Sequence, residues 1–409
     1  MSRVEERVQA VVEARDQSLD DLYVAACKLK QAIRAERIFQ NEKLAERCSI
    51  NKRFVNLESK DPTIPPIRFL LPEDEEKYQG RGYKCYVCRQ RFHKVHHFYH
   101  RMCPECAKEN YEKREQTADL TGKVAIVTGG RIKIGFQTCL KLLRAGATVI
   151  ATTRFPTDAR ERYQAEADYK EWAERLKIRQ LNLLDRNAIG EFLELVHEEH
   201  PHVDILINNA AQTIDRPPEY YNKLLSDAPV ESFDFPDLVD ENGLQVDQRL
   251  TNTWITHLDS TDESELMAVT LVNYIAPFIL LKGLRKLMGG KSPSCVINVS
   301  SMEGKFITSA RFKPDRHVHN NAAKAALNMI TRSIAFSWQK DNIFVNSVET
   351  GWITNEFPNG SFGKKKDSVF LPPLDEIDGA ARILDPIFTH NQGAEIWGQF
   401  LKDYYRASW

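Results

Sequence analysis

Apolar and polar residues alternate in two distinct patterns along the second half of the chain. Six short apolar runs predict buried β-strands, at 124–128, 148–153, 178–183, 203–208, 295–300 and 343–348. Between these runs apolar residues recur at helical spacing, which predicts helices at 135–145, 158–176, 186–199, 263–288 and 320–338. Continuous apolar strands separated by amphipathic helices predict an α/β fold, a Rossmann-type doubly wound parallel sheet covered on both faces.

The N-terminal part of the chain has a different pattern. Residues 1–47 are highly charged and helical in periodicity, with a narrow apolar stripe that includes Leu22, Leu29 and Ile33. The stripe lasts fewer than three heptads, which favours packing on the body of the protein or on a partner over a free coiled coil. Residues 48–82 contain DPTIPP and LPEDEE and are predicted to be a linker or a wrapping arm.

Two connections between the predicted elements are unusually long and polar. The segment 212–262 is rich in Pro, Asp and Asn, and the segment 354–374 has PNGSFGKKKD at its centre. Loops of this length in a compact domain usually form lids or partner surfaces. We expect both to be insertions in one dinucleotide-binding domain that spans 117–409.

Composition and charge narrow the classes of protein to be considered. Of 409 residues, 42% are apolar and 28% charged, as in a globular protein with a substantial core. Lys+Arg (56) and Asp+Glu (57) nearly cancel, so the total charge favours neither nucleic acid nor a membrane as partner. No run of about eighteen apolar residues predicts a membrane span. The acidic first residues do not resemble a secretory signal, and a cytoplasmic location is expected.

Four of the eight cysteines form a pattern typical of metal sites. Cys85, Cys88, Cys103 and Cys106 have the spacing C-x2-C-x14-C-x2-C, in which two knuckles can close a tetrahedron around zinc. A closed four-thiolate site has no open position for catalysis, so the predicted zinc is structural. Two alternatives remain open. One of the four histidines between 93 and 100 could replace a cysteine, or the thiols could be free in a reducing compartment.

The residues 83–116 that hold these cysteines are predicted to form a small zinc-binding module. This module is locally basic, with interleaved aromatics, a combination that can bind nucleic acid. Because the total charge is close to neutral, we favour a solvated face or an interdomain contact, and nucleic acid is not expected as a partner. Protein partners that bind through residues 1–116 remain open.

The first predicted strand of the α/β region runs into a glycine-rich turn and then into a helix. The turn is TGGRIKIG, at 128–135. Backbone N–H groups at the start of such a helix can bind the pyrophosphate of a dinucleotide. Lys133 stands between Gly130 and Gly135, where a third glycine is expected. Its side chain either adds positive charge beside the phosphates or occupies their site.

Together with motifs further along the chain, this turn makes residues 119–409 resemble the short-chain dehydrogenase/reductase family. The matching motifs, in the family's order, are NNAA at 208–211, Asn273 in LVNYIAPF, Ser301 in INVSSMEG, Lys324 in NNAAKAAL and the turn NSVETG at 346–351. The resemblance implies hydride transfer to or from a carbonyl or alcohol substrate, with Asn273, Ser301 and Lys324 in the active site. It does not identify that small-molecule substrate. It also implies that the helix 320–338 can form a homo-oligomer face.

The resemblance further implies which residues bind the cofactor. They are Gly129, Gly130, Arg131, Ile132, Gly135, Arg154, Asn182, Leu183, Asn209, Ala210, Lys324, Thr350, Gly351 and Ile353. Arg154 follows the second strand, where an acidic residue would bind the 2′-hydroxyl of NAD. An arginine there favours a 2′-phosphate, so NADP(H) is expected, with NAD(H) as the alternative.

The chain departs from the family at the catalytic tyrosine. Asn320 stands four residues before Lys324, at the tyrosine position, and no tyrosine lies between Ser301 and Lys324. An amide does not titrate near neutral pH and cannot act as a general acid or base. His317 would lie on the same face as Asn320 if the helix has already begun there, and is the candidate replacement. Two hypotheses therefore stand: an atypical NADP(H)-dependent oxidoreductase, and a catalytically inactive dinucleotide-binding scaffold or sensor.

Overall fold

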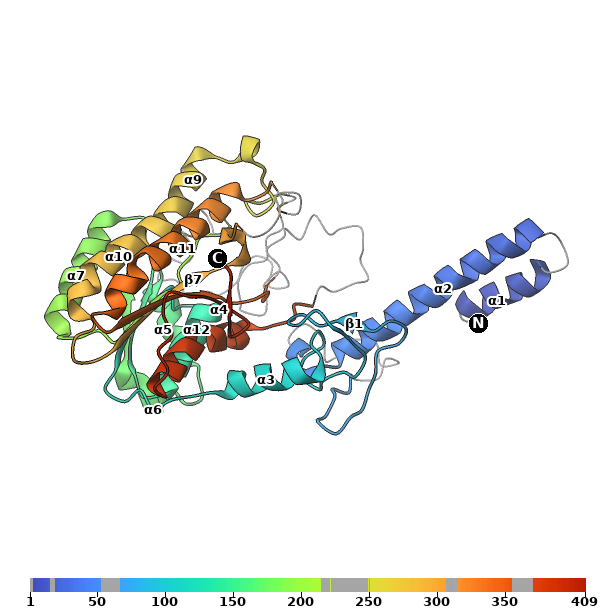
Figure 1. Cartoon of the computed structure of the whole chain (residues 1–409), viewed down its shortest axis with the longest axis horizontal. Coiled ribbons are helices and arrows are strands. Elements are labelled where there is room, and N and C mark those ends of the chain that lie inside the picture. Colours follow the sequence, from blue (N-terminus) through green and yellow to red (C-terminus); the bar gives the residue numbers. More distant parts are fainter. Residues whose placement is uncertain are drawn as a thin grey trace. The chain divides into compact units, whose positions relative to one another are not determined.

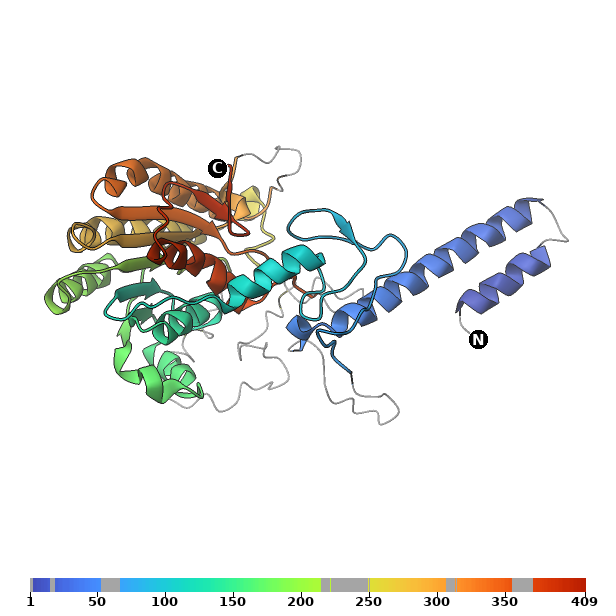
Figure 2. The ribbon, with the colours of Figure 1, turned by 60° about the horizontal axis from the view of Figure 1, so that its bottom comes forward.

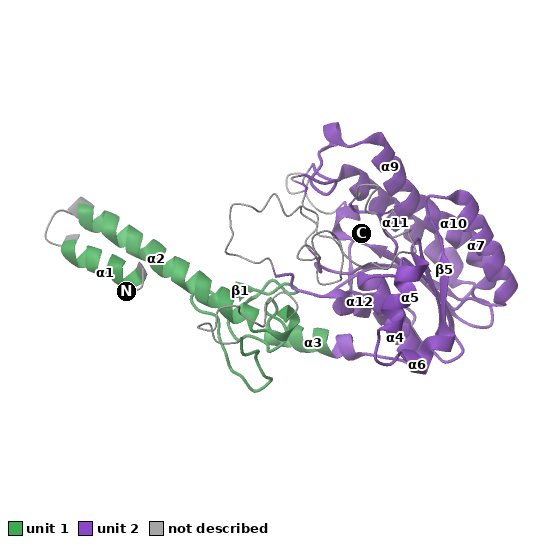
Figure 3. Ribbon diagram, turned by 180° about the vertical axis from the view of Figure 1, so that it is seen from behind, with its two compact units in different colours: residues 1–111 green, residues 112–409 purple. Residues whose placement is uncertain are grey.

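The structure is a computed structural model that describes residues 3–14, 19–52, 67–214, 221, 249, 251–306, 313, 315–354 and 371–409. The predicted insertions 212–262 and 354–374 lie largely outside these residues. The chain divides into two compact units, Met1–Tyr111 and Glu112–Trp409, which are coloured separately in Figure 3.

The second unit is built on one eight-stranded sheet. Its strands, in chain order, are β3 (Val124–Thr128), β4 (Thr148–Thr153), β5 (Leu176–Gln180), β6 (Ile205–Asn208), β7 (Ser294–Ser300), β8 (Ile343–Glu349), β9 (Phe400–Lys402) and β10 (Tyr405–Ala407). They lie in the order β10-β9-β8-β7-β6-β3-β4-β5, with β3 to β9 parallel and β10 antiparallel. The strand order reverses between β3 and β6, and ligands of such sheets bind beyond the carboxyl ends of the strands at this point.

Helices cover both faces of the sheet, as Figures 1 and 2 show. The helical elements of this unit are α4 (Lys133–Arg144), α5 (Pro156–Gln164), α6 (Tyr169–Trp172), η2 (Ala173–Arg175), α7 (Arg186–Glu199), η4 (Leu258–Ser260), α9 (Glu263–Thr270), the π-helical turn η5 (Leu271–Ile275), α10 (Ala276–Leu284), η6 (Arg285–Leu287), η7 (Met302–Gly304), α11 (Val318–Gln339) and α12 (Glu376–Asn391). One core cluster joins α4 and α12 to the sheet, and a second joins α7, α10 and α11 to its other face. The predicted doubly wound α/β fold is confirmed.

The predicted elements agree best with the structure where a strand is buried on both faces. The bounds of β3 and β4 are as predicted, and those of β7 and β8 differ by one residue at an end. The predicted strand 178–183 is wrong in its bounds, because β5 ends at Gln180. Leu181 and Leu183 are buried although they follow the strand, which is why the apolar run extends past its end.

Two predicted helices are interrupted. The predicted helix 158–176 consists of α5, α6 and a 3-10 turn. The predicted helix 263–288 contains a π-helical turn at Leu271–Ile275. By length and composition Glu263–Leu287 could cross a membrane, but Ala276, Leu280 and Leu284 are fully buried in the core. Packing against the sheet therefore accounts for the apolar residues on the buried side of this helix, while Leu266, Met267 and Phe278 are exposed.

The C-terminal helix α12 was not predicted, and an ion-pair cluster fixes its start. Asp375 caps the helix, and the Arg114 guanidinium lies 2.5 Å from the Asp375 carboxylate and 3.1 Å from that of Asp378. A Cβ on Gly379 would lie 2.5 Å from Ile353 and 3.1 Å from Ile134. The start of α12 is therefore packed directly against the glycine turn.

The first unit contains a pair of packed helices and the cysteine module. Its elements are α1 (Arg3–Ala14), α2 (Leu19–Glu46), η1 (Ser49–Asn51), β1 (Tyr83–Lys84), β2 (Arg91–Phe92) and the start of α3 (Pro104–Glu115), which continues into the second unit. Cys48, Tyr78 and Tyr99 are buried here, and the Tyr78 hydroxyl donates to the His100 carbonyl at 2.7 Å. Cys48, before residues 53–66, and Tyr78, after them, are thus both buried in the module.

Candidate active site

The glycine turn brings the end of β3 against the first turn of α4. A Cβ on Gly135 would lie 2.1 Å from the Gly129 carbonyl oxygen and 2.5 Å from Asn209 Nδ2, so only glycine fits there. Lys133 has φ +52°, a left-handed conformation that favours glycine. The lysine therefore occupies the backbone conformation of the missing third glycine, at a cost of about 1–2 kcal/mol.

Asn209, just after β6, ties this strand to the turn. Its Nδ2 donates to the carbonyl oxygens of Thr128 (2.9 Å) and Gly129 (3.3 Å). The backbone N–H groups of Asn209 and Ala210 both donate to Thr128 Oγ1 at 3.0 Å. Asn209 and Ala210 thus bond to Thr128 and Gly129, and the same turn also lines a cavity.

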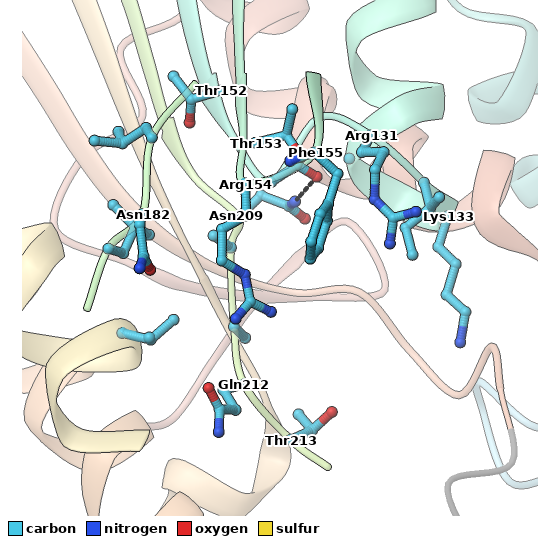
Figure 4. Close-up of a pocket in the computed structure, with 18 of the residues that line it drawn as sticks. Arg131, Lys133, Thr152, Thr153, Arg154, Phe155, Asn182, Asn209, Gln212 and Thr213 are labelled. Atoms are coloured by element: carbon cyan, nitrogen blue, oxygen red, sulfur yellow. Dashed lines mark hydrogen bonds between the residues drawn. The ribbon is translucent and has the colours of Figure 1, made fainter. Parts of the chain in front are cut away.

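A cavity of about 390 Å³ lies beside the turn (Figure 4). Nine of the fourteen expected cofactor residues line it: Gly129, Arg131, Ile132, Gly135, Arg154, Asn182, Leu183, Asn209 and Ala210. Gly130 lies behind the turn, where a Cβ would meet Cys139 and Ala151 at 2.9 and 3.0 Å. The expected residues Lys324, Thr350, Gly351 and Ile353 do not line this cavity.

The cavity also has lining residues that were not among the expected cofactor residues, although Lys133, Ile134 and Ala211 belong to the motifs. These additional residues are Lys133, Ile134, Thr152, Thr153, Phe155, Leu181, Ala211, Gln212, Thr213, Ile214, Tyr221 and Val272. Most of them directly neighbour an expected residue in the sequence. They could have been predicted from their position in the sequence, because the loops that follow β3 to β6 all lie at the same edge of the sheet.

The three cations at the cavity have different surroundings. The Arg131 guanidinium lies 2.6 Å from the Asp158 carboxylate and over the Phe155 ring. Burial acts to raise the pKa of Asp158, but bonds from Arg162 and Arg131 outweigh it and lower that pKa. Arg131 is therefore already neutralised.

Arg154 and Lys133 are not neutralised in this way. The Arg154 guanidinium lies over the rings of Phe155 and Tyr221, at 5.3 and 4.8 Å from their centroids. Within the described part of the chain neither Arg154 nor Lys133 has a carboxylate partner. Figure 4 shows both side chains at the cleft, Arg154 from the end of β4 and Lys133 from the glycine turn. Two unpaired positive charges therefore face the space where a phosphorylated ligand would lie.

The residues expected to be catalytic meet beyond this cavity. Asn273 lies in the π-helical turn, and its Oδ1 accepts from the Gln212 N–H at 2.7 Å. Its Nδ2 donates to the Gln212 carbonyl (3.0 Å) and to Asn320 Oδ1 (3.3 Å). Both asparagines are buried. A pair of buried amides thus lies one helical turn before Lys324.

Lys324 lies one helical turn after Asn320 and faces the end of β7. Its Nζ donates to the Val299 carbonyl at 2.8 Å, two residues before Ser301. Burial lowers the pKa of Lys324 to about 8, and the Glu303 carboxylate opposes that shift. A Cβ on Gly304 would lie 2.7 Å from the Lys324 backbone, so the turn after Ser301 packs directly on α11. The structure thus brings Asn273, Ser301 and Lys324 into one region.

The premise behind the prediction for His317 is wrong. Helix α11 begins at Val318, and His317 precedes it with φ +41°, so the helical-face argument does not apply. Its Nδ1 donates to the Trp254 carbonyl at 2.7 Å, and the two rings stack at 4.1 Å. Burial lowers the pKa of His317, and the bond to Trp254 opposes that effect. The ring anchors the segment before α9 to the start of α11.

The four cysteines of the module converge. Their Sγ atoms all lie within 4.8 Å of one another, and those of Cys88 and Cys103 are 3.8 Å apart. Zinc–sulfur bonds of about 2.3 Å in a tetrahedron place the sulfurs about 3.8 Å apart, so the geometry fits zinc. Among the described residues these four cysteines are the one group that could hold a metal ion. The nearby histidines are used otherwise: His96 Nδ1 accepts from the Phe98 N–H, for example, at 3.1 Å.

Comparison with known proteins identifies several relatives of the chain. The profile of the short chain dehydrogenases matches residues 123–228, and that of the enoyl-(acyl carrier protein) reductases matches 250–368. A 2-dehydro-3-deoxy-D-gluconate 5-dehydrogenase of Pseudoalteromonas atlantica is 33% identical over 241 residues, 58% of this chain and 74% of that enzyme. An uncharacterized protein, R665, of Acanthamoeba polyphaga mimivirus is 34% identical over 357 residues, 80% of this chain and 73% of the viral protein.

Solved structures share the fold at lower identity. A short chain dehydrogenase from Burkholderia cenocepacia, in complex with NADP, superposes with a TM-score of 0.50 at 19% identity, over 69% of this chain and 97% of that one. One from Salmonella enterica superposes equally well, at 17% identity, over 71% of this chain and 99% of that one.

A matched pair of glycine substitutions tests the turn. Gly135→Ala should lower the free energy of unfolding by about 1–3 kcal/mol, because its Cβ has no space beside the Gly129 carbonyl. Gly190→Ala in α7 is the control, since a Cβ there meets nothing within 4 Å and should stabilise by about 0.5–1 kcal/mol. Urea denaturation measures both. Equal effects of the two substitutions would contradict this description of the turn.

Proposed function

The chain belongs to the short-chain dehydrogenase/reductase family, and on that premise we propose that it is an NADP(H)-dependent oxidoreductase. It would transfer a hydride between the cofactor and a carbonyl or alcohol substrate. The choice of NADP(H) rests on Arg154, which lies at the carboxyl end of β4 and has no carboxylate partner among the residues that the structure describes. Support comes also from the dehydrogenase relatives and from the Burkholderia cenocepacia neighbour that binds NADP.

The cavity beside the glycine turn would hold the adenosine half of the cofactor. The bare backbone of Gly129 and Gly135 allows a pyrophosphate to approach the start of α4, and Lys133 adds charge at its rim. Arg154 would bind the 2′-phosphate, and Asn182 and Leu183 would border the adenine. The expected residues outside the cavity, Thr350, Gly351 and Ile353 among them, would contact the nicotinamide half.

The active-site residues have separable roles in this proposal. When bound, NADPH supplies the hydride that adds to the carbonyl carbon. The Ser301 hydroxyl and the Asn320 amide donate hydrogen bonds to the carbonyl oxygen and stabilise the negative charge that develops there. Lys324 is the proton source: its ammonium loses one proton to the alkoxide, through a water or the Ser301 hydroxyl, and regains it from solvent. In this proposal Lys324, and not His317, is the proton donor that replaces the tyrosine.

The scaffold hypothesis keeps one specific observation in its favour. The amides of Asn273 and Asn320 are buried and bond to each other, an arrangement that needs neither substrate nor proton transfer. On that hypothesis the chain binds NADP(H) and does not turn over any substrate.

We also propose that Cys85, Cys88, Cys103 and Cys106 hold a structural zinc ion. The support is the mutual distance of the four sulfurs, which matches a tetrahedral site. Such a site fixes two knuckles of a segment whose regular structure consists of two short strands and the helix α3. The metal therefore contributes folding free energy to the module.

Cofactor choice can be tested by isothermal titration. Arg154→Ala should weaken NADPH binding about 10- to 100-fold, the value of a charged hydrogen-bonded contact, and leave NADH binding unchanged. Arg160→Ala, on the exposed side of α5 and outside the cavity, is the matched control and should bind NADPH as the parent does. Loss of both cofactors in equal measure, or tighter NADH than NADPH binding by the parent, would overturn the choice of NADP(H).

The proton source can be tested by the pKa of Lys324 and, with any carbonyl compound that the protein reduces, by the pH dependence of the rate. In protein labelled with ¹³Cε-lysine, one resonance should be missing from the spectrum of the variant Lys324→Arg. In the parent protein this resonance should titrate with a pKa of about 8, because burial of the ammonium lowers its pKa. Carbonyl reduction should slow as pH rises through this pKa, since only the ammonium form can donate. Titration of Lys324 above pH 10, or a flat rate profile between pH 7 and 9, would exclude Lys324 as the donor.

The zinc proposal predicts metal content. Purified protein should contain one equivalent of zinc by mass spectrometry, and Cys88→Ser/Cys103→Ser should contain almost none and lose protease resistance in the module. Cys27→Ser, an exposed cysteine on α2, is the control and should keep its zinc. Zinc-free parent protein, or full metal content in the double variant, would refute the site.

A further inference from the structure

Positive charge is concentrated in the cysteine module, although the whole chain is nearly neutral. Between residues 77 and 108 lie eight lysines and arginines and a single acidic residue, Glu105, which gives a formal charge of +7. The whole chain carries −1, so the remainder carries −8. Four thiolates around a zinc ion would still leave the segment at about +5. The near-zero net charge of the whole chain is therefore the sum of a basic segment and an acidic remainder, and it does not exclude an anionic partner for the segment.

The acidic run just before this segment does not cancel its charge. Two of its carboxylates pair outside the segment, Asp74 with Arg68 at 3.1 Å and Glu76 with Arg47 at 3.0 Å. Glu75 pairs with Lys94 inside it, at 2.8 Å, and neutralises one of the eight cations. Five exposed cations have no carboxylate partner among the described residues: Arg81, Lys84, Arg89, Arg91 and Arg101. An unpaired set of this size on a small module is the electrostatic footprint of a polyanion site.

Three of these cations gather at the β1–β2 hairpin. Lys84 on β1 and Arg91 on β2 lie directly opposite each other, so their side chains share one face. The Arg91 guanidinium also donates to the Arg81 carbonyl at 3.3 Å, which brings Arg91 close to the Arg81 backbone. Like charges directly across a two-stranded ladder destabilise it. A bound phosphate between them would relieve that repulsion.

The other two cations lie over tyrosine rings. The Arg101 guanidinium is 4.8 Å from the Tyr83 ring centroid, and that of Arg89 is 5.7 Å from the Tyr86 centroid. The Tyr86 N–H donates to the Arg101 carbonyl at 2.7 Å, which links the two pairs. Arg89 lies in the first knuckle, with φ +63° and its N–H bonded to the Cys85 carbonyl. The cysteine knuckle therefore holds both arginines on aromatic supports.

We propose that this module binds single-stranded nucleic acid. The phosphates would contact Arg81, Lys84 and Arg91, and bases would stack on the exposed faces of the Arg89 and Arg101 guanidinium groups. The stacking pairs favour a single strand, since the bases of a duplex are already stacked and their faces are hidden. This binding is separate from the oxidoreductase proposal and uses only residues of the first unit.

The test uses the full chain with its zinc and fluorescein-labelled U20 RNA, followed by fluorescence anisotropy. Three to five phosphate contacts predict that log K falls with log salt with a slope of about −2 to −3.5 between 50 and 300 mM. Lys84→Glu/Arg91→Glu should weaken binding at least about tenfold. Lys28→Glu/Lys30→Glu, two exposed lysines on α2, is the charge-matched control and should bind as the parent does.

The stacking pairs have their own variants. Arg89→Lys/Arg101→Lys keeps the charge but loses the planar groups, so binding should weaken about 5- to 50-fold with an unchanged salt slope. Zinc content and circular dichroism establish that each variant is folded. Three results would overturn the proposal: no binding of U20 at 50 mM salt, equal loss in the hairpin and control variants, or tighter binding of a 20-base-pair duplex than of the single strand.

Discussion

The close approach of Gly135 to the Gly129 carbonyl is the constraint on which the candidate site depends. A Cβ at position 135 would lie 2.1 Å from that oxygen, so the chain can pass from β3 into α4 only with glycine there. The same contact brings Asn209 at the end of β6 within hydrogen-bond distance of the turn. The cavity opens where these three elements meet, at the reversal of strand order. Lys133 allows the same turn only in the left-handed backbone conformation, which is unfavourable for a lysine.

The second feature that shapes the function is the amide pair Asn273–Asn320. An asparagine can orient a carbonyl but cannot exchange its proton, so a reductase built on this chain must draw the proton from another group. Lys324 is buried, faces the strand end that leads to Ser301 and has its pKa lowered towards neutrality. In the proposed mechanism another group therefore donates the proton, while the positions that orient substrate and cofactor are kept. The further binding surface proposed on the cysteine module does not depend on this chemistry.

The six strands β3 to β8 and the glycine turn could be predicted from sequence because their residues are fixed by local rules, whereas the three-residue strands β9 and β10 were not predicted. Buried parallel strands are continuous apolar runs, and Gly129 and Gly135 are required by the backbone itself. Helix α12 was not predicted, because Pro386 lies inside it and because its buried residues include the charged Arg382 and Asp385, which do not indicate a core helix in the sequence. The left-handed backbone of His317 and the pairing of Arg131 with Asp158 depend on tertiary contacts that no local pattern encodes. The contact of Asn273 with Asn320 likewise could not be predicted, because it joins residues that are 47 positions apart in the sequence.

A crystal structure with bound NADP⁺ is the most direct test of the central claim, that this cleft is a working NADP(H) site beside an amide-based active centre. The account predicts the 2′-phosphate within hydrogen-bond distance of Arg154. It also predicts the nicotinamide ring between the Thr350–Ile353 turn and the Asn320 amide, with Lys324 near its ribose. A cleft that stays closed to the cofactor, or a nicotinamide pocket filled by protein side chains, would contradict it.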